Sequence, residues 1–155
     1  MTPQKRASLS IKGFKIRTNS QTEMTNEGKV RSLWKSFHEN IVPQLKEEDT
    51  FYGVFFNNDP ELHDNFDIIA GITSDDFDKN DVKVSENLSE VTLKEGDYLV
   101  FSAVGSVPQA TLRTWQQIRQ YFNENNCPHR RAYTTDYEHY IAPNVTKIYV
   151  SVENK

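Results

Sequence analysis

A strand–helix–strand–strand pattern occurs twice in this sequence of 155 residues, and the repetition constrains the fold more than any other feature. The ends of the two helical stretches align: LWKSFHEN, which begins at Leu33, matches IRQYFNEN, which begins at Ile118. Phe37 maps onto Phe122, a displacement of 85 residues, and a glutamate and an asparagine recur at the same offsets. Self-similarity of this kind is typical of duplicated structural units. The sequence therefore predicts two copies of one α+β unit.

The first copy covers residues of about 10–78, and it begins with a strand near residues 10–22. An amphipathic helix follows, because its apolar residues have the i, i+3, i+4, i+7, i+11 spacing of one buried face. These residues are Val30, Leu33, Trp34, Phe37 and Ile41. Pro43 ends the helix, since proline lacks the backbone N–H that the next turn requires. Two further strands are predicted near residues 50–57 and 66–74.

The second copy covers residues of about 88–153, with strands near residues 96–104, 131–140 and 145–152. Its helix follows Pro108, and the apolar spacing predicts that it buries Leu112, Trp115, Ile118 and Phe122. The acidic, asparagine-rich segment 75–81 between the copies is predicted to be a linker. Both copies fit in one domain spanning residues 1–155, which is long enough for a sizeable single core.

Composition excludes several classes of function. The formal net charge of −4 and the scattered basic residues argue against direct nucleic-acid binding, which needs a clustered basic surface. No stretch is long and apolar enough to predict a membrane span. The single cysteine, Cys127, cannot form an intrachain disulfide and suits a reducing cytoplasm. No phosphate-binding loop is present, and the calcium-loop spacing of Asp76, Asp78 and Asn80 lacks the required glycine and the closing glutamate, so no cofactor is expected.

The candidate site is a glutamate inside a tyrosine-rich strand, Asp136-Tyr-Glu-His-Tyr140. Strand alternation places Asp136, Glu138 and Tyr140 on one face, and Tyr137 and His139 on the other. Neighbouring same-face positions hold no lysine or arginine that would neutralise Glu138. A carboxylate among aromatic rings suits an organic cation, because it adds charge pairing to cation–π contact. The alternative is that Glu138 is solvated or paired with a basic residue distant in sequence.

The order of several short motifs resembles the gyrase-inhibitory-protein-like family, also known as AraC-type effector-binding domains. The quoted stretches begin at Lys29 (KVRSLWKSF), Phe51 (FYGVF), Gly96 (GDYLVFSAVG), Trp115 (WQQI) and Asp136 (DYEHY), and end with IYV from Ile148. The likeness covers nearly the whole chain, and it is greatest to stand-alone members, some of which are carried on mobile gene cassettes. It implies a pseudo-two-fold pair of units with an antiparallel sheet, whose two helices flank a ligand cleft.

The resemblance also implies a function, that of a cytoplasmic protein that binds cationic, lipophilic or aromatic small molecules. Glu138 would be the counter-ion, and aromatic residues from both copies would form the walls. Trp34 and Trp115, one from each helix, would stand at related places beside the cleft, although their spacing also suits simple core packing. The implied ligand-binding residues are Glu138, Tyr140, Tyr149, Tyr52, Trp34, Phe37, Trp115 and Tyr98.

Two other functions remain open at this point. Some relatives hydrolyse reactive natural products, which would require a second polar group near Glu138, and Asp136 is the evident candidate. Other relatives inhibit gyrase by binding the protein, so a protein partner or a homodimer is also conceivable. Only about nine residues precede the first predicted strand, so we expect no DNA-binding domain in this chain.

Overall fold

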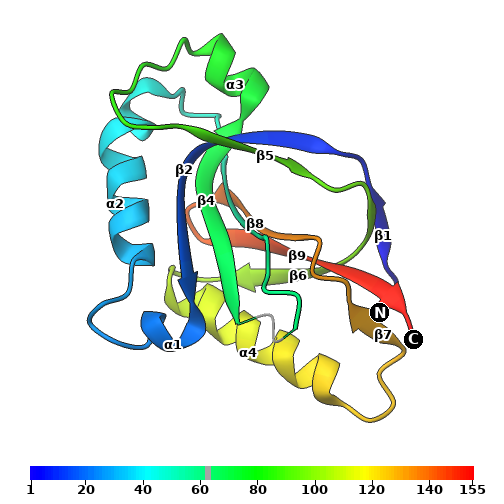
Figure 1. Ribbon diagram of the computed structural model, residues 1–155. Coiled ribbons are helices and arrows are strands. Elements are labelled where there is room, and N and C mark those ends of the chain that lie inside the picture. Colours follow the sequence, from blue (N-terminus) through cyan, green and yellow to red (C-terminus); the bar gives the residue numbers. More distant parts are fainter. Residues whose placement is uncertain (62–63) are drawn as a thin grey trace.

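The computed structural model describes residues 1–61 and 64–155, and in this part of the chain a curled antiparallel sheet carries short helices (Figure 1). The strands are β1 (Gln4–Arg6), β2 (Leu9–Asn19), β3 (Phe51–Phe56), β4 (Asn65–Thr73), β5 (Ser89–Leu93), β6 (Gly96–Val104), β7 (His129–Arg131), β8 (Thr135–Ala142) and β9 (Val145–Asn154). The helices are α1 (Ser20–Glu23), α2 (Val30–Asn40), α3 (Ser74–Lys79) and α4 (Gln109–Asn123), with a single 3-10 turn at Val42–Gln44.

The predicted duplication is confirmed by the order of the strands. The sheet runs β1-β6-β9-β8-β3-β4-β2-β5, and β7 pairs separately with β9. The first copy is therefore β2-α2-β3-β4 and the second is β6-α4-β8-β9, and the two halves of the sheet mirror each other about the β3–β8 seam. Each copy supplies one edge of the seam, which gives the molecule its pseudo-two-fold arrangement.

The register at the seam obeys the displacement found in the helices. Gly53 pairs with Glu138, and a shift of 85 residues carries position 53 onto position 138. The flanking pairs exchange under the same shift: Phe51 pairs with Tyr140 and Phe55 pairs with Asp136, while 51 maps onto 136 and 55 onto 140. The Gly53–Glu138 pair therefore lies on the pseudo-two-fold axis.

The sheet bends sharply where two glycines face each other across β2 and β4. Gly13 pairs with Gly71, and a Cβ atom on Gly13 would lie 2.0 Å from the Ala70 carbonyl oxygen. A Cβ atom on Gly71 would lie 2.3 Å from the carbonyl oxygen of Lys12. No side chain fits at either position, so the paired glycines allow the two backbones to approach closely and the sheet to curl.

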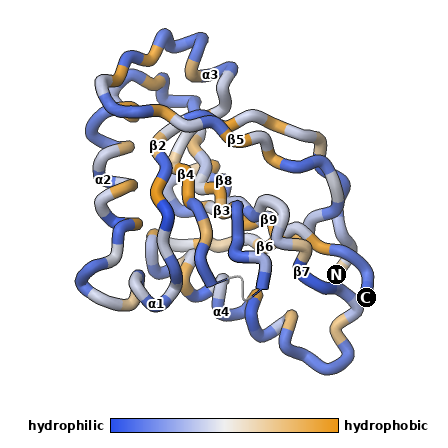
Figure 2. The backbone as a smooth tube through the Cα atoms, viewed as in Figure 1, coloured by the Kyte–Doolittle hydropathy of each residue, from blue (hydrophilic) through white to orange (hydrophobic). Residues whose placement is uncertain are grey.

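Both long helices pack on the same, outer side of the curled sheet (Figure 1). The α2 side buries Phe14, Leu33, Phe37, Ile41, Ile68, Ala70, Ile72, Phe77 and Val82. The α4 side buries Ala103, Ala110, Ile118, Ile148 and Val150. A third cluster fills the inner face, with Ile11, Tyr52, Val54, Phe56, Ile69, Leu93, Tyr98, Tyr137 and Tyr149. The apolar residues gather accordingly along the central strands, whereas the loops are polar (Figure 2).

Two details of the sequence prediction are wrong. The segment predicted to be a linker forms α3, because Thr73 caps its first turn and Phe77 is buried against the α2 side. Leu112 is 60% exposed, whereas Thr111 and Thr114 face the sheet instead. The hydroxyls of these two threonines are satisfied by carbonyl oxygens of their own helix, Pro108 and Ala110, which makes their burial inexpensive.

Candidate functional site

Glu138 is a buried carboxylate on the outer face of the sheet, beneath the two helices. It is 6% exposed. The indole Nε1 of Trp115 donates a hydrogen bond of 2.8 Å to Oε2, and the Tyr140 hydroxyl donates one of 2.6 Å to Oε1. Burial raises the pKa of Glu138 above its ordinary value, although these two hydrogen bonds act in the opposite direction. Among the described residues, no basic side chain forms an ion pair with this carboxylate.

Aromatic rings from both copies surround the carboxylate. The ring centroids of Trp34 and Tyr140 are 5.1 Å apart, and the two rings meet edge to face. On the other side, the ring of Trp115 lies 5.6 Å from that of Phe55. Trp34, Trp115 and Tyr140 are each half-buried, so these rings separate the carboxylate from solvent without being sealed into the core. The site is therefore a single carboxylate beneath a half-buried aromatic cover.

Gly53 makes room for this arrangement, although the sequence patterns did not mark it as a site residue. A Cβ atom at this position would lie 2.9 Å from Cζ2 of Trp34 and 3.3 Å from Oε1 of Glu138. Because contacts below 3.0 Å are not tolerated, any larger residue would push the Trp34 ring away. The sequence did contain a signal for Gly53, because the 85-residue displacement between the two copies maps Gly53 onto Glu138.

The structure brings only part of the predicted site together. Trp34, Trp115 and Tyr140 lie beside Glu138, and Phe37 supports Trp34 from the core, with ring centroids 5.5 Å apart. Phe37 is fully buried, so it is a supporting residue and not a wall. Phe51 and Phe55, which the sequence analysis did not select, lie on the same face because they pair with Tyr140 and Asp136.

Tyr52, Tyr98 and Tyr149 are not walls of the Glu138 site, because they lie on the inner face of the sheet. Tyr52 pairs with His139, and Tyr149 pairs with Tyr137, so both share the face opposite Glu138. Residue types alone cannot reveal this, since the face on which a side chain lies depends on how its strand is aligned with the neighbouring strand. The predicted separation of Glu138 from His139 within one strand is confirmed.

Asp136 shares the face of Glu138, but its oxygens are already engaged. Arg131 donates to Oδ2 at 2.7 Å, and the backbone N–H and the hydroxyl of Ser151 each donate to Oδ1 at 2.8 Å. The guanidinium of Arg131 in turn lies over the Trp115 ring, 5.7 Å from its centroid. Asp136 therefore holds Arg131 at the margin of the site, and it does not offer a free carboxylate next to Glu138.

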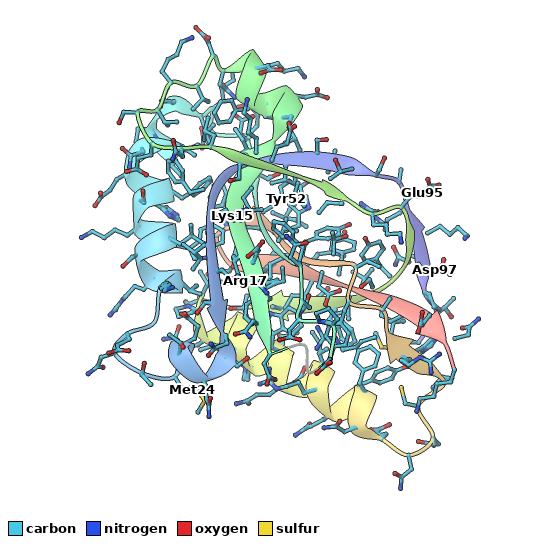
Figure 3. All side chains as sticks on the ribbon, viewed as in Figure 1. Lys15, Arg17, Met24, Tyr52, Glu95 and Asp97 are labelled. Atoms are coloured by element: carbon cyan, nitrogen blue, oxygen red, sulfur yellow. The ribbon has the colours of Figure 1, made fainter. Side chains whose placement is uncertain are left out.

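Other recesses and clusters in the described chain do not resemble this site. A groove of about 470 Å³ lies between β2 and α2, where it is lined by a mixture of polar and apolar side chains. It includes Lys15 (labelled in Figure 3), Lys29 and Glu86, but neither tryptophan. The described residues hold no group of three or more histidine, cysteine or acidic side chains suited to a metal ion. In the same part of the chain, no helix has the length and apolar character needed to cross a membrane.

Comparison with known proteins agrees with this architecture over nearly the whole chain. The sequence profile of a family described as Cass2, integron-associated effector binding protein, matches residues 5–152. An integron cassette protein from the mobile metagenome of Vibrio cholerae is 30% identical and superposes with a TM-score of 0.85. The match covers 97% of this chain and 94% of that protein.

Two further proteins match at lower sequence identity. SAV2435, whose structure was determined bound to tetraphenylphosphonium, is 20% identical with a TM-score of 0.73, and the match covers 97% of this chain and 92% of SAV2435. YobU of Bacillus subtilis (strain 168), named as a candidate transcriptional regulator, is 23% identical over 133 residues. That match covers 83% of this chain and 78% of YobU.

Proposed function

The chain belongs to the family of integron-associated effector-binding proteins, and from this premise we propose that it binds small organic cations with aromatic or lipophilic groups. Glu138 is the counter-ion in this proposal, and Trp34, Trp115 and Tyr140 are the walls. The observation that carries the proposal is a buried carboxylate whose hydrogen-bond donors, within the part of the chain that the structure describes, are all neutral side chains. SAV2435 provides support from outside the chain, since a relative with this fold is bound to an aromatic cation.

The charge of Glu138 is the energetic argument for a cationic ligand. Burying a carboxylate without a cationic partner costs several kcal/mol, which Trp115 and Tyr140 reduce but do not remove. A cation placed beside Glu138 recovers that cost through charge pairing. Each ring face that it meets adds about 0.5–2 kcal/mol of cation–π attraction. A neutral molecule of the same shape gains only the contact with the rings.

Access to the carboxylate requires the cover to open. Glu138 is almost fully covered, so Trp34, Tyr140 or Trp115 must change rotamer before a ligand reaches it. The cover is suited to such a change because each of the three residues is only half-buried. Ring faces and one charge fix the polarity of a ligand more strongly than its shape, so several cations of different outline are expected to bind.

Among the described residues, the hydrolase alternative lacks its second functional group. Acid–base hydrolysis at Glu138 would require a second polar group to activate water, and Asp136 is held by Arg131 and Ser151. We therefore propose binding without chemistry as the role of this site.

The decisive experiment replaces Glu138 by glutamine, which preserves the shape and the hydrogen bonding while removing the charge. For tetraphenylphosphonium we expect a loss of affinity of about tenfold to a hundredfold, or about 1.5–3 kcal/mol, as for a charge-assisted contact. Triphenylphosphine oxide, which is neutral, should bind the variant and the parent about equally. Isothermal titration calorimetry measures both affinities.

Glu39→Gln is the matched control, because Glu39 is an exposed carboxylate on α2 and its removal changes the net charge by the same amount. This control should bind tetraphenylphosphonium like the parent. Equal affinity of the parent and Glu138→Gln for the cation would show that Glu138 is a structural residue and would end the proposal.

A further inference from the structure

The inner face of the sheet carries a second aromatic cluster that the Glu138 site does not use. Tyr137 stacks on Tyr149 across β8 and β9, with ring centroids 4.5 Å apart and planes 12° apart. Tyr52 stacks on His139 across β3 and β8, at 4.1 Å and 7°. Tyr52 lies within the curve of the sheet (Figure 3), and the two stacks are neighbours, because Tyr52 and Tyr137 are 6.2 Å apart.

Arg6 lies at the edge of this cluster. It belongs to β1, whose three residues are all exposed, and β1 joins the sheet by pairing with β6. Its guanidinium carbon is 4.9 Å from the centroid of the Tyr149 ring, and the guanidinium interacts electrostatically with the phenols of Tyr137, Tyr149 and Tyr52. Among the described residues Arg6 forms no ion pair, whereas its neighbour Lys5 pairs with Asp97 at 3.5 Å. Arg6 therefore presents an uncompensated positive charge to solvent beside phenol groups.

The phenols near Arg6 are hydrogen-bond donors. Burial raises the pKa of Tyr137 to about 12, so this hydroxyl keeps its proton at neutral pH. The hydroxyl of Tyr149 has no hydrogen-bond partner in the described part of the chain. Tyr98, by contrast, is engaged with the Lys94 carbonyl oxygen and Thr135. A phenol hydroxyl next to a guanidinium can still donate its proton to an acceptor nearby.

The charges around this cluster are those of an anion site. His139 is neutral at physiological pH, because burial and the nearby Arg6 charge lower its pKa to about 4. Burial has the largest effect on the pKa of the Tyr52 phenol and raises it, while this phenol also experiences both charges, because Arg6 lowers its pKa and Asp76 of α3 raises it. Guanidinium and hydroxyl donors without a carboxylate acceptor are the groups that bind oxyanions in proteins.

We propose that Arg6, with the hydroxyls of Tyr137 and Tyr149, binds the oxyanion group of a small molecule on the face of the sheet opposite Glu138. The shared chemistry is that of a carboxylate or a phosphate, which accepts hydrogen bonds from a guanidinium and from phenol hydroxyls. The protein then has two sites of opposite charge preference, one on each face of β8. This second site does not depend on the proposed cation site.

The test compares the binding of benzoate, inorganic phosphate and neutral benzamide by following tyrosine ring signals in NMR titrations. Saturable binding of benzoate alone assigns the site to aromatic carboxylates, and binding of both anions assigns it to oxyanions in general. Either result supports the proposal when Arg6→Gln weakens the binding at least tenfold. The Tyr149→Phe variant keeps the ring and loses the donor, so it should weaken binding about threefold or more.

Lys5→Gln is the matched control, because it removes the same charge from the same strand on the opposite side. It should leave anion affinity unchanged, and both β1 variants should unfold at the parent's temperature. The proposal is overturned if neither anion saturates the parent at millimolar concentration, if benzamide binds as well as benzoate, or if Lys5→Gln weakens binding as much as Arg6→Gln. Glu138→Gln should bind the anions normally, which separates this site from the cation site.

Discussion

Glu138 and His139 are adjacent in β8, and their side chains lie on opposite faces of the sheet. Burial disfavours the charged form of both side chains. Burial raises the pKa of Glu138 above its value in the unfolded chain. The neutral carboxyl group therefore contributes to the free energy of unfolding at low pH, and this contribution is lost as the pH rises through the folded-state pKa. Burial lowers the pKa of His139 to about 4, so the free energy of unfolding falls as the pH drops from about 6.5 towards 4. The two residues thus limit stability from opposite ends of the pH range.

Replacing Glu138 separates these contributions. Relative to Glu138→Gln, we expect the parent to lose stability as the pH rises above about 4.5, because only the parent acquires a buried charge. At neutral pH the empty variant should be at least as stable as the parent. Urea unfolding followed at several pH values between 4 and 8 measures the difference. A difference that is independent of pH would mean that Glu138 does not ionise differently in the folded and unfolded chain.

At the same scale, residue types drew attention to Glu138 and the family resemblance supplied Trp34, Trp115 and Tyr140, but neither predicted the division of the tyrosines between two faces. The alternation within β8 was sufficient to separate Glu138 from His139. Assigning Tyr52 and Tyr149 requires the register of β3 and β9 against β8, which is set by tertiary packing. Gly53 was missed because a glycine carries no chemical group, and its role lies in the space that it leaves for Trp34.

Helix α2 begins without a capping side chain of its own, and Glu23 substitutes for one. The Glu23 carboxylate accepts the backbone N–H groups of Lys29 and Val30, and the Thr18 hydroxyl also donates to it. Burial opposes the charged carboxylate, but these hydrogen bonds outweigh it and lower the pKa of Glu23. The carboxylate thus ties α1 to the start of the helix that presents Trp34.

We expect Glu23→Ala to lower the free energy of unfolding by about 1 kcal/mol at neutral pH, as for the loss of a helix cap. Because the folded-state pKa is lowered, this contribution is present above the ordinary value of 4.5 and is lost as the pH falls through the folded-state pKa. Thermal unfolding at pH 7 and at low pH tests both statements. Glu27→Ala, an exposed carboxylate in the same loop, should have little effect at either pH.

Element by element, the sequence predicted α2 well and three strands not at all. The helix has a strong apolar period with its buried residues on one side. The strands β1, β5 and β7 have at most five residues each, and β1 buries none of its side chains. Such strands form because a neighbouring edge offers unpaired backbone groups, and this information is not contained in their own residues.

In the whole molecule, the two copies share one inner core. The inner-face cluster combines Val54 and Ile69 of the first copy with Tyr98, Tyr137 and Tyr149 of the second. The outer strands also cross over, since β1 precedes the first copy yet pairs with β6 of the second. Neither copy can therefore separate from the other without exposing the seam between β3 and β8.

This arrangement predicts that both copies unfold in one transition. Val54→Ala at the seam should destabilise the molecule by about 2 kcal/mol and move a single calorimetric peak without splitting it. Val104→Ala, at a position that is 68% exposed, is the control and should shift the peak little. Two resolved peaks, or a van't Hoff enthalpy well below the calorimetric enthalpy, would show that the copies unfold separately.

The location of the Gly53–Glu138 pair on the pseudo-two-fold axis bears on how such a protein can arise by evolution. A homodimer of a single unit would carry the same residue at both axial positions, either two glycines or two facing carboxylates. Two carboxylates at that distance repel each other, and one would take up a proton. Two glycines would provide space without charge. Joining the two units in one chain removes this restriction, because each half can then differ: one half provides the space and the other provides the charge.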